Sequence, residues 1–448
     1  MRASTLLALV LALSWAAPCG AGLVKRGRPA FEPESMAVWE GRTVEAVDIQ
    51  GHESTREDLI RRLIRTAVGQ PLDAGTVAED VARLVNLGAF ADVRAHAAEV
   101  QPGGGVRVTF VLSETYKILP VPALLYTEEN GWSVGAGVSA TNLGGQAMKL
   151  GGKAFFGGTR QYWVTFDAPW LYGRNHHRSF TAFLAKRDRP DELRGFHEDS
   201  YEVHPSFGRH FGDDRGKITV GLTYFQMLSD QPGITLSPDD SDHWLQPAAA
   251  VTWDTRDDWQ APRRGWRNEL ELTRSLQAGG GAAFWRLNAD LRRWVPTAAR
   301  QKLLLSSLLT MQSGDLGTDV PVYFDFYVGG ANSVRGYEPQ DRPLSGKNQL
   351  LGTAEYSLVL LQPRQWDIAF LSIRLGLEAA VFADGGLVWT RGPEFALDRT
   401  RGGVGAGLRL LVPGTEMMRL DFGWSEQQGI HFHFASGSKP VAQRQRLR

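Results

Sequence analysis

The chain has 448 residues, with 49 Lys and Arg against 49 Asp and Glu, so its formal net charge is zero. This balance argues against a nucleic-acid-binding protein, and the single cysteine excludes a disulfide framework or a cysteine-based zinc site within one chain. Beyond the first 25 residues no apolar run approaches the ~18 residues of a membrane-spanning helix. A membrane β-barrel remains compatible with the composition, because lumen-facing polar residues lower its mean hydropathy.

The N-terminus is typical of an export signal. The apolar stretch from Thr5 to Ala17 is followed by small residues, which predicts cleavage near Ala21. The alternative is a lipoprotein anchored at Cys19, which the preceding proline disfavours. Cleavage after Ala21 would leave a mature chain without cysteine, as suits an oxidising compartment. We therefore assign residues 1–21 to a signal peptide and residues 22–42 to a linker.

Residues 43–115 have the pattern of a small domain with the order β-α-α-β-β. The segment from Thr43 to Ile49 alternates in polarity as a strand does. Ser54 and Glu57 have the spacing of a capping box for the first helix. Asp73 is the predicted start of the second helix, and two strands follow it.

Residues 116–437 predict an all-β membrane barrel, followed by a tail at 438–448. Sixteen segments of about 8–12 residues are separated by turn residues. Between Ile373 and Asp384, for example, one face is mixed polar and the other wholly apolar. Sixteen is an even number, as in single-chain bacterial barrels. The alternatives are a twelve-stranded barrel, if some short segments are not strands, and a soluble β-sandwich.

The connections between these segments alternate in length. If the small domain lies on one side of the membrane, the tight connections lie on that side, as in outer-membrane barrels. The tight connections are Asn142–Gln146, Gly212–Gly216 and Pro413–Glu416, and the long ones are Arg187–Ser200, Ser229–His243 and Ser313–Gln349.

Three passages carry the candidate function. The longest connection contains Val334-Arg335-Gly336-Tyr337. A turn in the middle of the barrel contains Asp254, Arg256 and Asp257, followed by Pro262 and Gly265, and a later strand ends in Phe382-Ala383-Asp384-Gly385-Gly386. With the small domain in front of them, these passages resemble the outer-membrane assembly superfamily of BamA/TamA-type insertases and two-partner secretion transporters, whose N-terminal modules are POTRA domains.

In that superfamily the long loop folds back into the barrel, and its arginine pairs with acidic residues of the inner wall. The resemblance implies this role for Arg335, with Glu355 and Asp384 as the acids. Strand parity agrees, because Glu355 alternates with apolar neighbours and Asp384 shares a face with Glu378. The alternative is that Arg335 is a solvated loop residue.

The junction of the first and last strands is the second candidate feature. The first strand carries Pro120 and Pro122, which lack N–H donors and are typical of sheet edges. The last strand is short and places Ile430, Phe432 and Phe434 on one face. This pattern predicts a weak lateral seam, and the resemblance implies that such a seam opens to a substrate. The alternative is that the prolines only mark the start of the strand.

Two other motifs give little evidence for a functional site. His431 and His433 share a strand face, but no third metal ligand is near in sequence, so we expect no metal site. The glycines from Gly403 to Gly407 lack the βαβ context of a nucleotide loop, and we interpret them as relieving barrel curvature.

We therefore expect a non-enzymatic protein without cofactors that inserts or translocates polypeptides at the bacterial outer membrane. Its N-terminal domain would lie in the periplasm. The expected partners are outer-membrane lipids, unfolded or exported polypeptides and periplasmic proteins bound by the POTRA-like domain, with no nucleic acid. The alternatives are a passive diffusion channel and a dedicated exporter of one protein or lipid.

Overall fold

The computed structural model describes residues 24–26, 36–127, 130–171, 178–191, 195–338, 345–368, 371–411 and 417–436. The predicted signal peptide, the predicted tail and the connection Pro413–Glu416 lie outside these residues, as does most of the predicted linker. Among the residues described, no helix is both long and apolar enough to cross a membrane.

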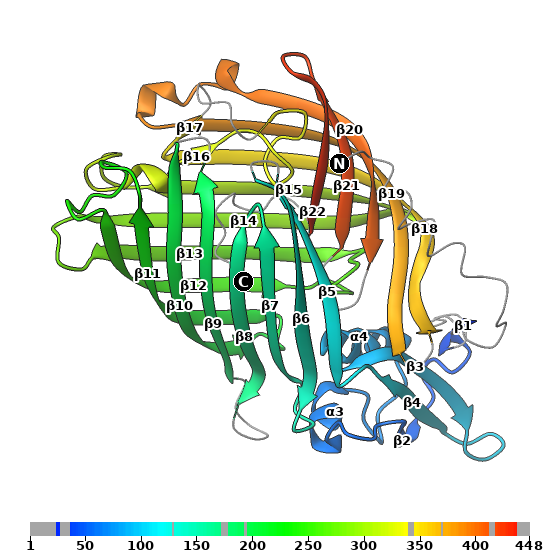
Figure 1. The fold of residues 1–448 in the computed structure, drawn as a ribbon. Helices are drawn as coiled ribbons and strands as arrows, with labels where there is room; N and C mark the ends of the chain where they lie inside the picture. Colours follow the sequence, from blue (N-terminus) through cyan, green and yellow to red (C-terminus); the bar gives the residue numbers. More distant parts are fainter. Residues whose placement is uncertain are drawn as a thin grey trace.

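The small domain packs two helices on a three-stranded sheet (Figure 1). The sheet has the order β2-β4-β3, with β2 parallel and β3 antiparallel to the central strand. Met36, from the predicted linker, is fully buried in the core of this domain. The elements are β2 (Val44–Gln50), α3 (Glu57–Leu63), α4 (Ala74–Asn86), β3 (Phe90–Glu99) and β4 (Val106–Glu114).

The two helix starts differ from each other in their chemistry. Asp73 accepts hydrogen bonds from two backbone N–H groups in the first turn of α4, so the prediction for this helix is confirmed. The predicted capping box of Ser54 and Glu57 is wrong, because the start of α3 has no side-chain cap. Ser54 and Thr55 instead bind the carboxylate of Glu114 at the end of β4.

Sixteen antiparallel strands form the large sheet, as predicted, and this overturns the twelve-stranded alternative. In chain order they are β5 (Ile118–Thr127), β6 (Gly131–Leu143), β7 (Met148–Gly157), β8 (Arg160–Leu171), β9 (Arg178–Asp191), β10 (Phe196–Phe211), β11 (Gly216–Ser229), β12 (Ser241–Asp254), β13 (Gly265–Gln277), β14 (Ala283–Ala298), β15 (Gln301–Gln312), β18 (Asn348–Ile368), β19 (Leu371–Trp389), β20 (Arg401–Leu411), β21 (Met418–Ser425) and β22 (Gly429–Ser436).

Strand lengths differ from the sequence prediction in two places. The expected long connection Arg187–Ser200 is mostly strand, because β9 reaches Asp191 and β10 begins at Phe196. The pair β18 and β19 also runs further than expected, to Ile368 and from Leu371. Charged residues fill the first extension, and Pro363 with two register shifts interrupts the second, so the hydrophobic alternation used to find the strands was weak in both.

Side chains alternate between an exposed apolar outer face and a polar lumen. In β19, Val381 is 56% exposed and Glu378 is 2% exposed. In β21, Phe422 is 59% exposed and Asp421 is 1% exposed. A soluble sandwich would bury the apolar face, whereas this sheet presents that face outward and keeps its charged residues inside.

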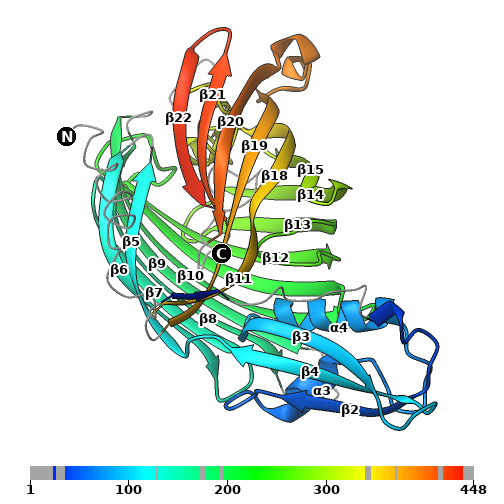
Figure 2. The same cartoon turned by 90° about the vertical axis from the view of Figure 1, so that its right-hand side faces the viewer.

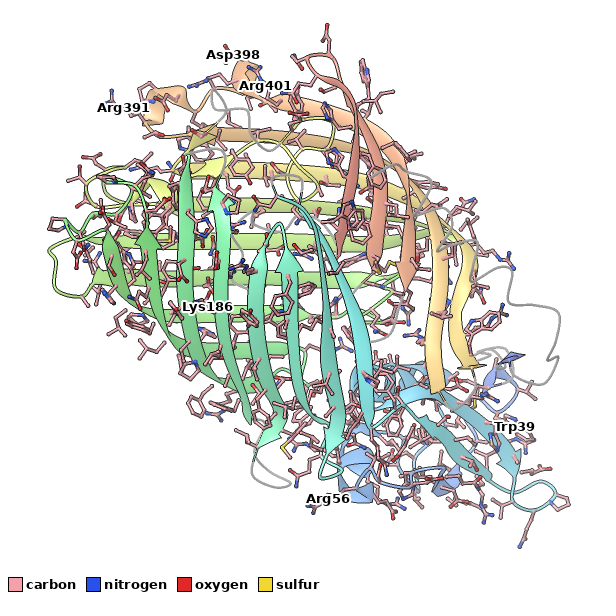
Figure 3. All side chains as sticks on the ribbon, in the orientation of Figure 1. Trp39, Arg56, Lys186, Arg391, Asp398 and Arg401 are labelled. Carbon is pink, nitrogen blue, oxygen red and sulfur yellow. The ribbon has the colours of Figure 1, made fainter. Side chains whose placement is uncertain are left out.

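The barrel has two distinct ends. The small domain lies at the end where β5 begins, which we call the near end, and Arg56 marks that domain in Figure 3. Arg391 lies at the opposite, far end (Figure 3). The tight connection Asn142–Gln146 lies at the near end as predicted, since Asn142 donates a 2.7 Å hydrogen bond to Thr55 of the small domain.

The carboxylate of Glu114 ties the segment before α3 to the sheet. Partial burial raises the pKa of this carboxyl, but the hydroxyl and backbone N–H groups of Ser54 and Thr55 lower it more strongly, to about 2. A carboxyl whose pKa is lower in the folded state stabilises that state above its unfolded pKa near 4.5. This contribution is lost as the pH falls from about 4.5 towards 2.

We expect Glu114→Gln to speed amide hydrogen exchange in residues 51–57 at neutral pH, because a neutral amide accepts weaker hydrogen bonds than a carboxylate. The wild-type chain should show the same loss of protection only when the pH falls below about 4. Hydrogen exchange measured by mass spectrometry, corrected for the pH dependence of the intrinsic exchange rate, checks both expectations. Glu53→Gln is the control, and equal exchange in both variants would contradict the assignment.

Candidate functional site

The long connection between β15 and β18 folds back into the barrel. Val334 and Tyr337 pack in a buried apolar cluster with Leu308 of β15 and Leu351 of β18. Arg335, between them in sequence, is fully buried. A guanidinium remains charged at any physiological pH, so its burial requires carboxylate partners.

Three carboxylates from three different strands surround Arg335. Its Nε and Nη2 donate to the two oxygens of Asp384 in β19, at 2.7 and 2.9 Å, and its backbone N–H donates to the same group at 3.1 Å. Its Nη1 donates to Glu355 of β18 and to Asp421 of β21, both at 3.0 Å. The ring of Phe382 lies 3.2 Å from the guanidinium carbon. The arginine therefore links the loop to three strands at once.

Two further arginines balance the charge of these acids. Arg409 of β20 donates to Glu355 at 2.6 and 2.9 Å and to Asp421 at 2.5 Å. Arg419 of β21 lies 3.7 Å from Asp421 and donates to the loop at Ala331 and Asn332. Three arginines thus face three carboxylates, Glu355, Asp384 and Asp421, in one buried network.

Glycines in the wall make room for the loop backbone. A Cβ on Gly403 would lie 1.9 Å from the carbonyl oxygen of Arg335, and one on Gly423 would lie 2.5 Å from the nitrogen of Gly336. Gly336 itself has a φ of +99°, which favours glycine. The glycine run that we interpreted as relieving curvature therefore also lets the loop approach β20.

The last strand contacts the same loop residue. The Nε2 atom of His433 in β22 accepts the backbone N–H of Gly336 at 3.0 Å. Ser425 donates its hydroxyl to the carbonyl of Gly336, while His431 lies against Gln428 at 3.1 Å. Within the described part of the chain, no group of three or more His, Cys, Asp or Glu residues is placed to hold a metal ion.

The first half of the loop has a separate anchor on the opposite wall. The hydroxyl of Tyr323, in the short helix η1 (Val322–Phe324), donates to Asp242 of β12 at 2.7 Å and accepts from the indole of Trp244 at 2.8 Å. Phe324 packs beside it among aromatic residues. The loop therefore crosses the lumen between two walls.

The mid-barrel turn predicted from Asp254, Arg256 and Asp257 lies at the near end. Asp254 pairs with Arg256 at 2.6 Å, and Asp257 accepts two backbone N–H groups of the same turn. Burial raises the pKa of the Asp257 carboxyl. Asp258 pairs with Arg374 of β19. These bonds shape the turn and hold it against β19.

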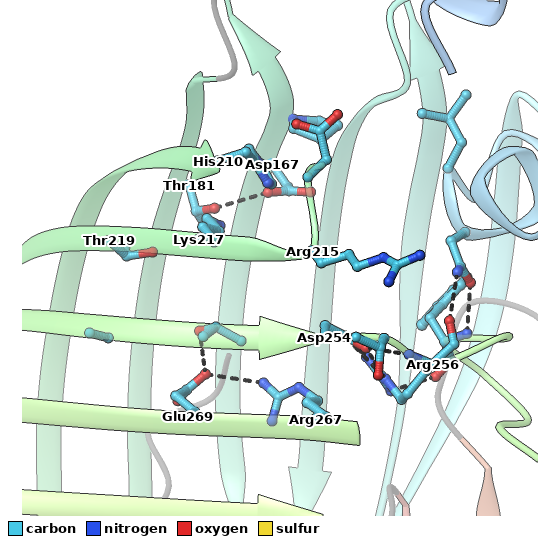
Figure 4. Close-up of a pocket in the computed structure, with 18 of the residues that line it drawn as sticks. Asp167, Thr181, His210, Arg215, Lys217, Thr219, Asp254, Arg256, Arg267 and Glu269 are labelled. Atoms are coloured by element: carbon cyan, nitrogen blue, oxygen red, sulfur yellow. Dashed lines mark hydrogen bonds and ion pairs between the residues drawn. The ribbon is translucent and has the colours of Figure 1, made fainter. Parts of the chain in front are cut away.

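Helix α4 covers part of the near end of the lumen. Asn86 donates to the carbonyl of Arg256 at 3.3 Å and accepts the backbone N–H of Trp259 at 2.8 Å. Glu79 pairs with Arg215 at 3.1 Å. Behind this contact lies a cavity of about 870 Å³ lined by charged residues of both signs (Figure 4).

The seam between the first and last strands differs from every other strand junction. A register of paired residues joins each of the other fifteen neighbouring pairs. Fewer described residues are in contact between β22 and β5 than at any other junction of neighbouring strands, and Figure 2 shows the two strands on either side of this junction. Phe434 instead contacts Trp132 of β6, with ring centroids 6.1 Å apart.

The predicted seam residues are placed as follows. Pro120 is exposed, Ile430 and Phe432 are exposed on the outer face, and Phe434 is half-buried. The side chain of Pro122 lies outside the described residues, although its backbone is part of β5.

Residues 142–439 match the family described as the Omp85 superfamily domain, and residues 42–115 match the surface antigen variable number repeat, a POTRA family. The chain belongs to the Omp85 superfamily. The Omp85 match covers most of the barrel and includes all the acids around Arg335.

Curated relatives of this Omp85 chain are longer than it is. It is 23% identical over 437 residues to outer envelope protein 80, chloroplastic, of Oryza sativa subsp. japonica, covering 86% of this chain and 59% of that protein. It is 22% identical over 436 residues to the outer membrane protein assembly factor BamA of Nitratidesulfovibrio vulgaris, covering 88% and 51%. The chain thus spans somewhat over half the length of these relatives.

Solved structures of two other proteins share the fold. BamA of Haemophilus ducreyi lacking POTRA domains 1–3 has a TM-score of 0.54 and 15% identity, covering 88% of this chain and 83% of that one. CdiB of Escherichia coli has a TM-score of 0.55 and 14% identity, covering 98% and 83%. These likenesses support the barrel and its N-terminal domain as the shared architecture.

The sequence predicted Arg335, Glu355 and Asp384, and the structure places both acids within hydrogen-bond distance of Arg335. It missed Asp421 and Arg409. The signal for both was present, because both lie on the polar face of their strands, but only the register of β20 with β21 brings them to the loop of this Omp85 barrel.

We expect Gly403→Ala to expel the loop, because the new Cβ would overlap the carbonyl of Arg335. Trypsin should then cleave the folded protein after Arg335, which is inaccessible in the wild type; mass spectrometry of the fragments detects this. Gly402→Ala is the matched control, since its Cβ would meet nothing closer than 3.8 Å. Cleavage after Arg335 in both variants, or in neither, would contradict the role of Gly403.

We expect Arg335→Lys to lower the unfolding temperature of the barrel, since a lysine cannot bind Asp384 bidentately and serve two further carboxylates. Breaking a buried ion pair costs roughly 3–5 kcal/mol. The temperature at which heating changes the gel mobility of the barrel in SDS measures the effect. Arg391→Lys, at an exposed position (Figure 3), should leave it unchanged; an equal effect of both would refute the prediction.

Proposed function

We propose that this protein inserts or translocates polypeptides at the bacterial outer membrane, with its near end and small domain in the periplasm. The observation that carries the proposal is the sparse contact between β22 and β5, which is smaller than at any other junction of neighbouring strands in the described chain. Unpaired strand edges are templates for pairing with another chain. Opening of this seam would offer an incoming polypeptide two such edges within the membrane.

The sequence at the seam supports this proposal. Pro120 in β5 cannot donate a ladder hydrogen bond. The outward aromatic residues of β22, Phe432 and Phe434, lie beside Phe422 and Trp132, so apolar side chains line the outside of the junction. A junction with so few contacts is easier to part than a long continuous ladder.

The buried arginine network lies on the strands next to the seam. Arg335 links the loop to β18, β19 and β21, and the same loop reaches β22 through His433. We propose that this anchor holds the last strands in place while the seam opens. Its function is then mechanical, and removing Arg335 should reduce assembly activity without changing the fold of the small domain.

The proposed work is non-enzymatic and needs no cofactor. The driving force would be the folding and strand pairing of the substrate. Backbone groups that are unpaired in the unfolded substrate become hydrogen-bonded when it forms strands. Outer-membrane lipids and unfolded or exported polypeptides are the proposed partners, and the small domain is the proposed docking module for periplasmic proteins.

The test is a disulfide across the seam in a Cys19→Ser background. One cysteine is placed at Leu124 in β5 and a series along residues 432–435 in β22. We expect that an oxidised pair abolishes the assembly or export of cargo proteins in cells and that reduction restores it. The single-cysteine variants are the controls for oxidation itself.

A pair that crosslinks completely and still supports normal activity would overturn the seam as the route of the substrate. The protein would then be a lumenal conduit or a passive channel. Deletion of the loop around Arg335 separates these two, because a static pore should gain conductance in planar bilayers and lose no cargo.

A further inference from the structure

Beyond the near rim of the barrel, β18 and β19 continue as a two-stranded ribbon. The register of β18 with β15 ends at Leu358, and that of β19 with β20 ends at Gly376. The two strands nevertheless stay paired with each other as far as Ile368 and Leu371. Among the described residues, no barrel strand pairs with this edge of β18, which β15 covers inside the barrel, along the ribbon.

Part of this edge is protected against strand addition. The register of β18 with β19 shifts twice between Val359 and Arg364, and Pro363 in this stretch has no N–H to donate. Bulges and prolines are the usual means by which proteins keep an open edge from pairing. From Gln365 to Ile368 the pairing is regular again, so the protection ends there.

The regular stretch is occupied by the chain itself. The short strand β1 (Val24–Arg26) pairs with it in antiparallel register, from Val24 opposite Ile368 to Arg26 opposite Trp366 (Figure 1). A strand of three residues makes few ladder hydrogen bonds. A longer extended segment would make more of them on the same edge and could take its place.

The side chain of Trp366 at this edge has a buried hydrogen-bond donor. The indole Nε1 of Trp366 is buried and has no hydrogen-bond partner among the described residues. The guanidinium of Arg364 stacks on its ring at 4.7 Å. A buried donor without an acceptor is unfavourable, and a backbone carbonyl of an added strand is an acceptor that could satisfy it.

We propose that the β18 edge from Gln365 to Ile368 is a strand-addition site for an extended polypeptide segment, with β1 as its resident occupant. The inference rests on the proposed function, because a near end that faces the periplasm is the end at which cargo polypeptides arrive. Recognition is through the backbone, so the site tolerates many sequences but rejects proline at paired positions. Displacement of β1 is the step that frees it.

The probe for this site is a fluorescent peptide with the sequence of residues 22–28, Gly-Leu-Val-Lys-Arg-Gly-Arg. Its binding is measured by fluorescence anisotropy to two forms of the mature full-length barrel in detergent. One form lacks residues 24–26. The other carries Lys25→Cys and Asp367→Cys, positions that are opposite each other in the register, and is oxidised to hold β1 in place.

We expect the peptide to bind the deletion form at least tenfold more tightly than the oxidised form, and reduction of the disulfide to weaken this difference. A peptide with proline in place of its lysine is the control and should not bind. Equal binding to both forms, equal binding of the proline peptide, or failure of the cysteine pair to crosslink would each overturn the proposal.

This assay separates the inference from the proposed function. Peptide binding at the ribbon does not require that cargo passes through the seam. If the peptide binds as expected while the seam disulfide leaves activity intact, the proposed route fails and the strand-addition site stands. If the seam disulfide blocks activity and the peptide does not bind, the reverse holds.

Discussion

The burial of one guanidinium group organises the far half of this barrel. Arg335 is charged and fully buried, so it needs carboxylate partners, and these come from the barrel wall. The wall strands that face its backbone must also lack side chains at the points of closest approach. This explains why acids on three strands converge on it and why glycines occupy the facing positions of β20 and β21. The loop, the wall charges and the wall glycines form one mutually dependent set.

The pairing of buried charges is also consistent with the zero net charge of the sequence. The lumen holds both signs in pairs, as in the arginines and carboxylates around Arg335 and in the buried pair of Lys302 and Glu378. Paired charges stay inside, and apolar residues face outward. A chain with an ordinary mean hydropathy can therefore present an apolar outer surface, and its composition alone conceals this.

Much of the fold could be predicted from sequence because strands with one apolar face alternate with period two. All sixteen strands were found in this way, and Asp73 marked its helix correctly. Predictions failed where a local pattern had a stronger competitor. Ser54 and Glu57 have the spacing of a capping box, but the distant carboxylate of Glu114 takes the hydroxyl of Ser54.

The candidate site could be predicted only in part. Parity alone shows that Glu355 and Asp384 face inward, and the resemblance to a family supplied Arg335 as their partner. Tyr323 and Asp242 form the second anchor of the loop, yet they are separated by 81 positions in the sequence. Contacts between a loop and a wall depend on how the loop crosses the lumen, which leaves no periodic signal in the chain.

The loop with two anchors has a mechanical consequence for the whole barrel. Tyr323 ties it to β12 and Arg335 ties it to β18, β19 and β21, so it acts as a crossbar between opposite sides. A cylinder braced at one end cannot easily become oval there. The loop therefore braces the far rim from inside the lumen, whereas the near rim is held from outside by the contacts of the small domain with Asn142, Arg215 and Arg256.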